Sequence, residues 1–269
     1  MFLRAVSLFM EISEITGLYF QRNRVKHMDS YIDIHSHILP QIDDGAENFD
    51  MSMRMLETAS ENNIREIILT PHNKPMRHNV SFQTMEKLAG RLGEEAYKRR
   101  MDIRFHLGNE IYYRSDILEA LGEGKACTMA GSSYVLVEFG PMDSFGYIRN
   151  GIYHVLSGGY RPILAHAERY AEVTVSVERA EALKEMGCYI QVNAGSVMGE
   201  YGFATRHFTR SLLKRKLVYF VATDAHKDSG KRTPRLAECG QFIARKYGKD
   251  YAVRLLKENP AGVIADEYI

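Results

Sequence analysis

The sequence predicts an α/β fold, a distorted, TIM-like (β/α) barrel of seven strands. Short apolar runs alternate with segments of helical periodicity from residue 31 to residue 226. Both faces of each run are apolar, which is typical of strands buried in a parallel sheet. Seven such units in one unbroken chain favour a closed or nearly closed barrel. An open doubly wound sheet is the alternative, but no Gly-x-Gly-x-x-Gly pattern follows the first strand.

The elements can be assigned in order along the chain. The predicted strands are Tyr31–Ile34, Glu66–Thr70, Ile103–Leu107, Tyr134–Val137, Pro162–Ala165, Tyr189–Val192 and Val218–Ala222. Helical faces are indicated by apolar residues three and four positions apart. They comprise Met51, Met55, Leu56 and Ala59, then Phe82, Met85, Leu88, Ala89, Leu92 and Ala96, and finally Ala180, Leu183 and Met186. The residues after Pro234 are predicted to form one or two helices that pack against the rest of the domain.

The composition is that of an ordinary globular protein, and its net charge does not indicate binding to nucleic acid or to a membrane. Of 269 residues, 45% are hydrophobic and 26% charged, and the formal net charge is +1. We interpret residues 1–27 as an N-terminal extension outside the core of the domain. Their apolar run is too short and too often interrupted by charged residues to span a membrane as a helix. Residues 28–269 are predicted to form a single domain, and Met28 is a candidate for the true start. The three cysteines are widely spaced and include no Cys-x-x-Cys pair, which favours a reduced, cytoplasmic protein.

Metal-competent side chains close the predicted strands. They are His35 and His37, His72, Glu110, Glu138, His166, and Asp224 with His226, while Asn193 ends the sixth strand. In a parallel barrel the carboxyl ends of all strands meet at one face, so these residues should converge. Five histidines and three acids in such positions predict a polynuclear metal site.

The residue types suit that chemistry. His35 and His37 are two positions apart on extended chain, so their side chains point the same way. Carboxylates can bridge two ions, as two-metal hydrolases require. Without thiolates the expected ions are manganese, iron, zinc or magnesium, and the histidines argue against calcium or magnesium alone. Asp43 and Asp44 precede Gly45 and fit a polar loop, with a ligand role for Asp44 as the alternative. The remaining histidines, His27, His78, His106, His154 and His207, are interpreted as ordinary polar residues.

Several motifs, in order, resemble the polymerase-and-histidinol-phosphatase (PHP) superfamily. They are His35-Ser36-His37, Leu39-Pro40, Asp43-Asp44-Gly45 and Thr70-Pro71-His72. The later motifs resemble its bacterial manganese-dependent protein-tyrosine phosphatases, the CpsB/YwqE group. These are Gly108-Asn109-Glu110, Val137-Glu138-Phe139, Leu164 to Tyr170, Gln191 to Ser196 and Thr223-Asp224-Ala225-His226. The likeness runs from about Tyr31 to the C-terminus.

The resemblance implies a PHP fold with a trinuclear site, manganese being expected and iron or zinc possible. By motif position the ligands would be His35, His37, Asp44, His72, Glu110, Glu138, His166, Asp224 and His226. Arg169 and Arg232 would clamp phosphate, since guanidinium forks match its oxygens. Two departures concern the clamp: Ala167 stands where relatives more often have proline, and a longer loop leaves Lys231 competing with Arg232.

The function implied is hydrolysis of phosphotyrosine, on a bacterial tyrosine kinase that regulates capsule or exopolysaccharide synthesis. One alternative is a histidinol-phosphate or other small-molecule phosphatase on the same fold. Another is a non-catalytic regulator that binds the kinase tail. A PHP nuclease is disfavoured by the near-zero net charge and the lack of a basic stripe.

One motif points to a different chemistry. Cys239 and Arg245 have the Cys-x5-Arg spacing of thiolate tyrosine phosphatases. That mechanism needs a glycine-rich loop and a thiol of depressed pKa. The residues between them include Phe242, Ile243 and Ala244, which indicate a helix packed on the core.

Overall fold

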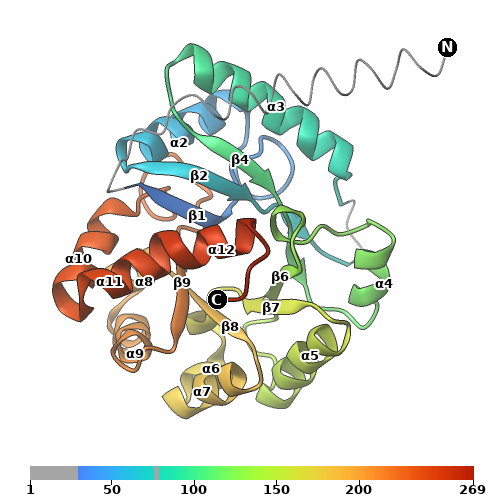
Figure 1. Ribbon diagram of the computed structural model, residues 1–269, viewed down its shortest axis with the longest axis vertical. Coiled ribbons are helices and arrows are strands. Elements are labelled where there is room, and N and C mark those ends of the chain that lie inside the picture. Colours follow the sequence, from blue (N-terminus) through green and yellow to red (C-terminus); the bar gives the residue numbers. More distant parts are fainter. Residues whose placement is uncertain (1–29, 76–78) are drawn as a thin grey trace. The chain divides into compact units, whose positions relative to one another are not determined.

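Across residues 30–75 and 79–269, which the computed structural model describes, nine short strand segments occupy seven positions around a barrel (Figure 1). The segments are β1 (Tyr31–Ser36), β2 (Ile64–Leu69), β3 (His72–Asn73), β4 (Arg104–Leu107), β5 (Glu110–Tyr112), β6 (Tyr134–Glu138), β7 (Arg161–Leu164), β8 (Tyr189–Asn193) and β9 (Val218–Ala222). All their pairings are parallel. The predictions for residues 1–27, for Met28, and for His27 and His78 lie outside the described residues.

Two strand positions are interrupted, which the sequence analysis did not foresee. The chain forms a three-stranded sheet, β1-β2-β4, and a six-stranded sheet, β3-β5-β6-β7-β8-β9. Segments β2 and β3 are separated by Thr70 and Pro71, and proline has no N–H to donate to a ladder. Asn109 lies in the matching gap between β4 and β5. Its Nδ2 donates to Pro71 O (2.9 Å) and its Oδ1 accepts from Cys127 N (2.9 Å), so a side chain adds hydrogen bonds at the interruption.

Backbone hydrogen bonds join the two sheets and close the barrel. Thr70 N donates to Ser36 O (2.9 Å), which continues the pairing past the end of β2. On the other side of β1, Asp224 N donates to His35 O (2.8 Å) and His37 N donates to Ala225 O (2.9 Å). These bonds place the end of β9 beside β1, and the predicted seven-stranded α/β barrel is confirmed.

Helices surround the barrel (Figure 1). They are α2 (Phe49–Glu61), α3 (Phe82–Lys98), α4 (Ile117–Gly122), α5 (Phe145–Ser157), α6 (Ala171–Thr174), α7 (Val177–Glu185), α8 (Ala194–Met198), α9 (Phe203–Lys214) and α10 (Ala237–Tyr247). The chain ends with α11 (Lys249–Val253), a π-helical turn (Arg254–Glu258) and α12 (Asn259–Ile264). None of the helices in the described residues is long and apolar enough to cross a membrane.

The residues of the predicted helical faces are buried or partly buried in the core, except Phe82. In α2 all four predicted residues, Met51, Met55, Leu56 and Ala59, are buried, and Asn48 caps the helix by accepting from Met51 N (2.9 Å). In α3, Phe82 is 43% exposed, so its assignment to the buried face was wrong. It is the first residue of α3, three positions before Met85, the first buried residue of that helix.

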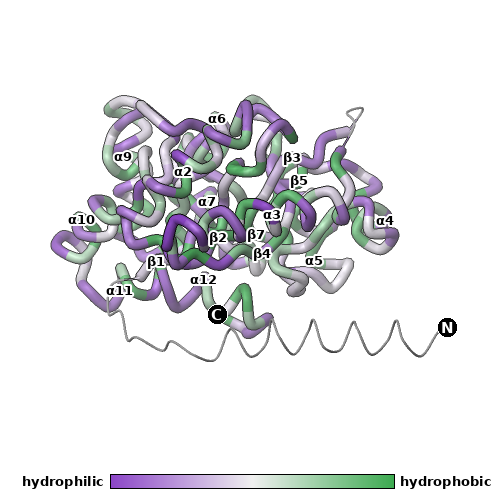
Figure 2. Tube along the Cα trace, turned by 90° about the horizontal axis from the view of Figure 1, so that it is seen from above, coloured by the Kyte–Doolittle hydropathy of each residue, from purple (hydrophilic) through white to green (hydrophobic). Residues whose placement is uncertain are grey.

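The apolar core has two parts. The barrel interior is filled by side chains from alternate strand positions, among them Ile34, Ile68, Leu136 and Phe220. Val263 of α12 belongs to this interior cluster, so α12 covers the end where the strands begin. The larger part packs the outer faces of the strands against the helices. In Figure 2, α12 and the C-terminus lie on the opposite side of the barrel from β3 and β5.

The last residues of the chain fasten this covered end. Arg161, the first residue of β7, donates through Nη1 to Asp266 O (3.2 Å) and Glu267 O (3.3 Å). Its guanidinium lies 3.6 Å from the centre of the Tyr268 ring. Tyr134 Oη also donates to Glu267 O (2.6 Å). These contacts order a chain end that has little apolar surface of its own.

We expect Arg161→Ala to lower the free energy of unfolding by about 1 to 2 kcal/mol, the worth of a cation–π contact and a few partly exposed hydrogen bonds. Thermal denaturation should show a loss of roughly 2–4 °C per kcal/mol for a domain of this size. The exposed Arg149→Ala on α5 is the control. A melting temperature equal to that of the control would contradict the fastening role.

Candidate metal centre

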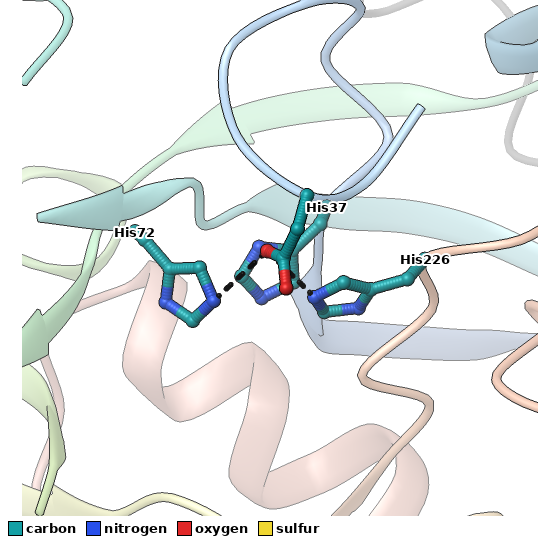
Figure 3. A group of neighbouring side chains, drawn as sticks. His37, His72 and His226 are labelled. Atoms are coloured by element: carbon teal, nitrogen blue, oxygen red, sulfur yellow. Dashed lines mark ion pairs between the residues drawn. The ribbon is translucent and has the colours of Figure 1, made fainter. Parts of the chain in front are cut away.

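The nine side chains predicted as ligands meet at the carboxyl ends of the strands. Their donor atoms form four overlapping groups, each with all atoms within 4.8 Å of one another. The groups are His37, Asp44, His72 and His226; His35, His37 and Asp224; His35, Glu110 and His166; and His72, Glu110 and Glu138. Shared members join the groups into one cluster. Figure 3 shows the rings of His37, His72 and His226 turned toward a common space.

Glu110 lies at the centre of this cluster and is fully buried. Its Oε1 is 2.7 Å from His166 Nε2 and 3.3 Å from His35 Nε2. Its Oε2 is 2.8 Å from His72 Nδ1 and 3.3 Å from His37 Nε2. One carboxylate therefore faces four imidazoles, which is the arrangement expected of a group that bridges ions.

The two aspartates before Gly45 have different surroundings. Asp44 Oδ1 is 3.2 Å from His72 Nε2 and 3.4 Å from His226 Nε2, and its side chain is 65% exposed. Asp43 lies behind the cluster, where its Oδ2 accepts from His37 Nδ1 (2.7 Å) and His72 N (3.0 Å). Asp44 thus faces the common space, while Asp43 orients a histidine. This orienting role of Asp43 was not predicted from the sequence.

The ring nitrogens indicate that a cation is needed between His35 and His37. His35 Nδ1 is 3.2 Å from Gln191 Oε1, and His37 Nδ1 is 2.7 Å from Asp43 Oδ2. Both partners are acceptors, so both Nδ1 atoms carry the proton. The two Nε2 atoms then face each other at 3.2 Å with their lone pairs. A proton or a metal ion between them removes this conflict.

Burial and neighbouring charges shift the pKa values of the cluster. Burial opposes ionisation of Glu110, but His35, His166 and His37 hold the pKa of its carboxyl well below the usual range. Burial also opposes charge on His37, yet Asp43 and Glu110 raise its pKa to about 10. In contrast, burial lowers the pKa of His166 to about 4 and leaves it neutral at pH 7. Ions binding here would have to displace the proton from His37.

Several buried polar atoms of the cluster make no well-directed hydrogen bond within the described residues, although two of them, His72 Nδ1 and Glu110 Oε2, lie 2.8 Å apart. They are His72 Nδ1, Glu110 Oε2, Glu138 Oε2 and His166 Nδ1. Leaving such atoms unpaired is costly, and divalent ions would satisfy most of them. The mixed nitrogen and oxygen donors suit manganese, iron or zinc. The residues present therefore fit a polynuclear metal centre.

The two predicted arginines reach the cluster from opposite sides of Asp224. Arg169 Nη2 is 2.7 Å from Asp224 Oδ2. Arg232 Nη2 is 2.8 Å from Asp224 Oδ1 and 2.9 Å from His226 Nε2. The ammonium of Lys231 lies instead 5.8 Å from the centre of the Tyr201 ring. Of the two candidates in this loop, Arg232 is the one in contact with predicted ligands.

Backbone conformation contributes to the placement of these groups. His166, Asp224 and Arg232 have positive φ values of 34°, 50° and 57°. Left-handed conformation is unfavourable for residues with a Cβ and is concentrated at functional sites. At His166 the backbone is held by its N–H, which donates to Gln191 Oε1 (2.8 Å).

Comparison with known proteins identifies the family. The family model described as capsular polysaccharide synthesis, CpsB/CapC, matches residues 31–265. The chain belongs to the CpsB/CapC family. It is 36% identical over 249 residues to the tyrosine-protein phosphatase CpsB of Streptococcus pneumoniae, covering 88% of this chain and all of the relative. It is 34% identical over 201 residues to the tyrosine-protein phosphatase YwqE of Bacillus subtilis, covering 72% and 77%.

Solved structures agree with the family assignment. A structure from a study of YwqE and CpsB, described as unique metal-dependent tyrosine phosphatases, matches with a TM-score of 0.82 and 28% identity. The match covers 88% of this chain and 96% of that one. The dihydropyrimidinase of Brevibacillus agri matches with a TM-score of 0.55 at 10% identity, covering 88% and 71%, and shares the fold alone.

This family member also has a buried amide network that the sequence analysis did not detect. Gln191 Oε1 faces His35 Nδ1 and accepts from His166 N, while Gln191 Nε2 donates to Asn193 Oδ1 (2.8 Å). Asn193 Nδ2 in turn donates to Asp224 Oδ2 (2.9 Å). The signal was present as two polar residues in the otherwise apolar strand β8. A strand position facing the cluster can hold the residues that orient the ligands.

We expect Gln191→Leu to weaken metal binding by about 10–100-fold, the usual effect of losing a group that orients a ligand. A titration against a competing chelator would measure this. Gln241→Leu, at an exposed position of α10, is the matched control. Equal affinities of the two variants would contradict the orienting role of Gln191.

Cys239, and the histidines within the described residues that were interpreted as ordinary polar residues, lie outside the metal centre. Cys239 is buried in the core on α10, and burial raises the pKa of its thiol, so it is no nucleophile. His106 pairs with Glu66 (3.0 Å), and His154 faces Tyr113 Oη (3.2 Å). His207 stacks on Phe203. None of these histidines lies in the four metal-competent groups.

Proposed function

We propose that this chain is a metal-dependent protein-tyrosine phosphatase. The observation that carries the proposal is one carboxylate, Glu110, surrounded by four imidazoles beside two arginines that share Asp224. This arrangement occurs in a chain whose family and relatives are tyrosine phosphatases of capsular polysaccharide synthesis. The site alone indicates a hydrolase, and the family membership narrows the proposed reaction to hydrolysis of phosphotyrosine.

The proposed metal ligands are the nine residues named from the sequence. They are His35, His37, Asp44, His72, Glu110, Glu138, His166, Asp224 and His226. We propose a trinuclear centre with manganese as the native ion, while iron and zinc fit the same donors. When bound, the ions neutralise phosphate charge and make coordinated water more acidic.

The chain's own residues supply the rest of the chemistry. Arg169 and Arg232 would hold the phosphate oxygens with N–H groups aimed at the charge of the transferring group. His35 and His37 are kept in one tautomer by Gln191 and Asp43, so their Nε2 atoms stay directed at the site. Tyrosine leaves as a phenolate whose conjugate acid has a pKa near 10, so a strong general acid is not required.

The proposed substrate is phosphotyrosine on a protein, in particular the tail of a bacterial tyrosine kinase in capsule or exopolysaccharide synthesis. Support comes from the family description. An open cluster suits such a substrate, because Asp44 at its rim is largely exposed and a chain segment can approach.

The test is turnover of a phosphotyrosine peptide and of histidinol phosphate by chelated protein to which manganese is added back. The Cys239→Ala variant is assayed in parallel. We expect manganese-restored activity that favours the peptide and is unaffected by the cysteine substitution. Preference for histidinol phosphate would move the protein to the small-molecule alternative, and no turnover of either would leave a different phosphoester substrate or a kinase-binding regulator.

A further inference from the structure

Tyr201 lies in the loop between α8 and α9, against Gly195 in the first turn of α8. The loop is shaped by Gly199 and Gly202, whose φ values of 96° and 95° suit glycine. A Cβ at Gly195 would lie 3.1 Å from Tyr201 Cε2 and 2.6 Å from Glu200 Oε2. The absence of a side chain at Gly195 therefore lets the loop, with its aromatic ring, pack closely against the first turn of α8.

The ring of Tyr201 adjoins the arginine side of the metal centre. Arg169 Cζ lies 5.9 Å from its centre and Lys231 Nζ 5.8 Å from it. Arg169 in turn contacts Asp224 at 2.7 Å. Tyr201 is half-buried, so part of its surface stays open beside the group expected to hold phosphate.

We infer that Tyr201 is a wall of the subsite for the aryl ring of phosphotyrosine and determines selectivity for aryl over alkyl phosphates. This inference rests on the proposed function. One ester oxygen separates phosphorus from the aryl ring, so a phosphate held by Arg169 brings that ring near Tyr201. Aromatic pairs interact at centroid distances of about 4.5–7 Å, in offset or edge-to-face geometry. An alkyl phosphate held by the same arginine has no ring to place there.

A positioning role is the competing explanation, because the cation–π contact could merely hold Arg169 in place. The two roles predict different kinetics. Loss of a contact to the aryl ring affects aryl substrates and leaves phosphate binding intact. Displacement of Arg169 weakens every phosphate ester and inorganic phosphate alike.

The experiment compares Tyr201→Leu and Tyr201→Phe in the manganese-loaded protein. Substrates are a phosphotyrosine peptide and a phosphoserine peptide of otherwise identical sequence, with inorganic phosphate as competitive inhibitor. Phe203→Leu, two residues away and 73% exposed, is the matched control. For Tyr201→Leu we expect kcat/KM on the phosphotyrosine peptide to fall about tenfold, mainly through KM. Activity on the phosphoserine peptide and inhibition by phosphate should change less than about twofold, and Tyr201→Phe should match the wild type.

Each other result overturns the inference. An equal loss on both peptides with weaker phosphate inhibition would assign Tyr201 to positioning Arg169. Wild-type behaviour of Tyr201→Leu would show that the aryl ring lies elsewhere. In both of those cases wild-type turnover of phosphotyrosine leaves the proposed function standing. No turnover by the wild-type protein would instead overturn the proposed function together with the inference.

Discussion

Replacing Glu110 by alanine or glutamine is expected to lower kcat/KM on a phosphotyrosine peptide by at least about 10³-fold, because several kcal/mol of charge stabilisation by bound ions would be lost. Glu110 contacts His35, His37, His72 and His166 at distances of 2.7 to 3.3 Å. Its removal withdraws the negative charge from the centre of the cluster. Metal content, measured by mass spectrometry of the desalted protein, should fall with activity.

The glutamine variant separates chemistry from folding. Glu110 is fully buried, so alanine leaves a cavity, whereas glutamine keeps the volume and removes the charge. Glu66→Gln is the matched control, since Glu66 on β2 also pairs with a histidine, His106, but outside the cluster. A Glu110→Gln protein that melts like the wild type, keeps its ions and retains activity would refute the bridging role.

The barrel and the converging residues were predictable because both follow from short-range patterns. Two apolar faces on each run identify buried parallel strands, and strand ends of a parallel barrel meet at one face. His35 and His37 are two residues apart on β1, and their rings face the same space, as the extended spacing requires. His106 on β4, interpreted from the sequence as an ordinary polar residue, pairs with Glu66 outside the cluster.

What the sequence analysis missed depends on contacts between distant segments. Asp44 was expected to be a ligand from the resemblance, but only the folded loop shows that its neighbour Asp43 lies behind His37 and orients it. Asn109 bonds Pro71 O at the interruption between β2 and β3, a role that no local pattern of the sequence indicates. Gln191 is separated by 156 positions from His35, to which it bonds. Such pairings arise from tertiary packing, which a single sequence does not encode in its periodicity.

Replacing Arg169 by alanine is expected to lower kcat/KM by about 10²–10³-fold, the usual cost of removing a donor aimed at charge in the transition state. Arg169→Lys should recover little, because an ammonium cannot make the two parallel bonds of a guanidinium. Inorganic phosphate should inhibit both variants more weakly than the wild type. Arg179→Ala is the matched control, since Arg179 on α7 pairs with Glu172 away from the cluster.

The metal content of the Arg169 variants distinguishes two roles for Arg169, which contacts Asp224 at 2.7 Å: binding phosphate, or orienting Asp224 as a metal ligand. If Arg169 binds phosphate, the ions should remain at wild-type stoichiometry, since Asp224 keeps Asn193 and Arg232 as partners. Loss of ions together with activity would mean that Arg169 acts through Asp224, by orienting a ligand. The phosphate clamp would then rest on Arg232 alone, and Arg232→Ala would be expected to abolish phosphate inhibition while Arg169→Ala would not.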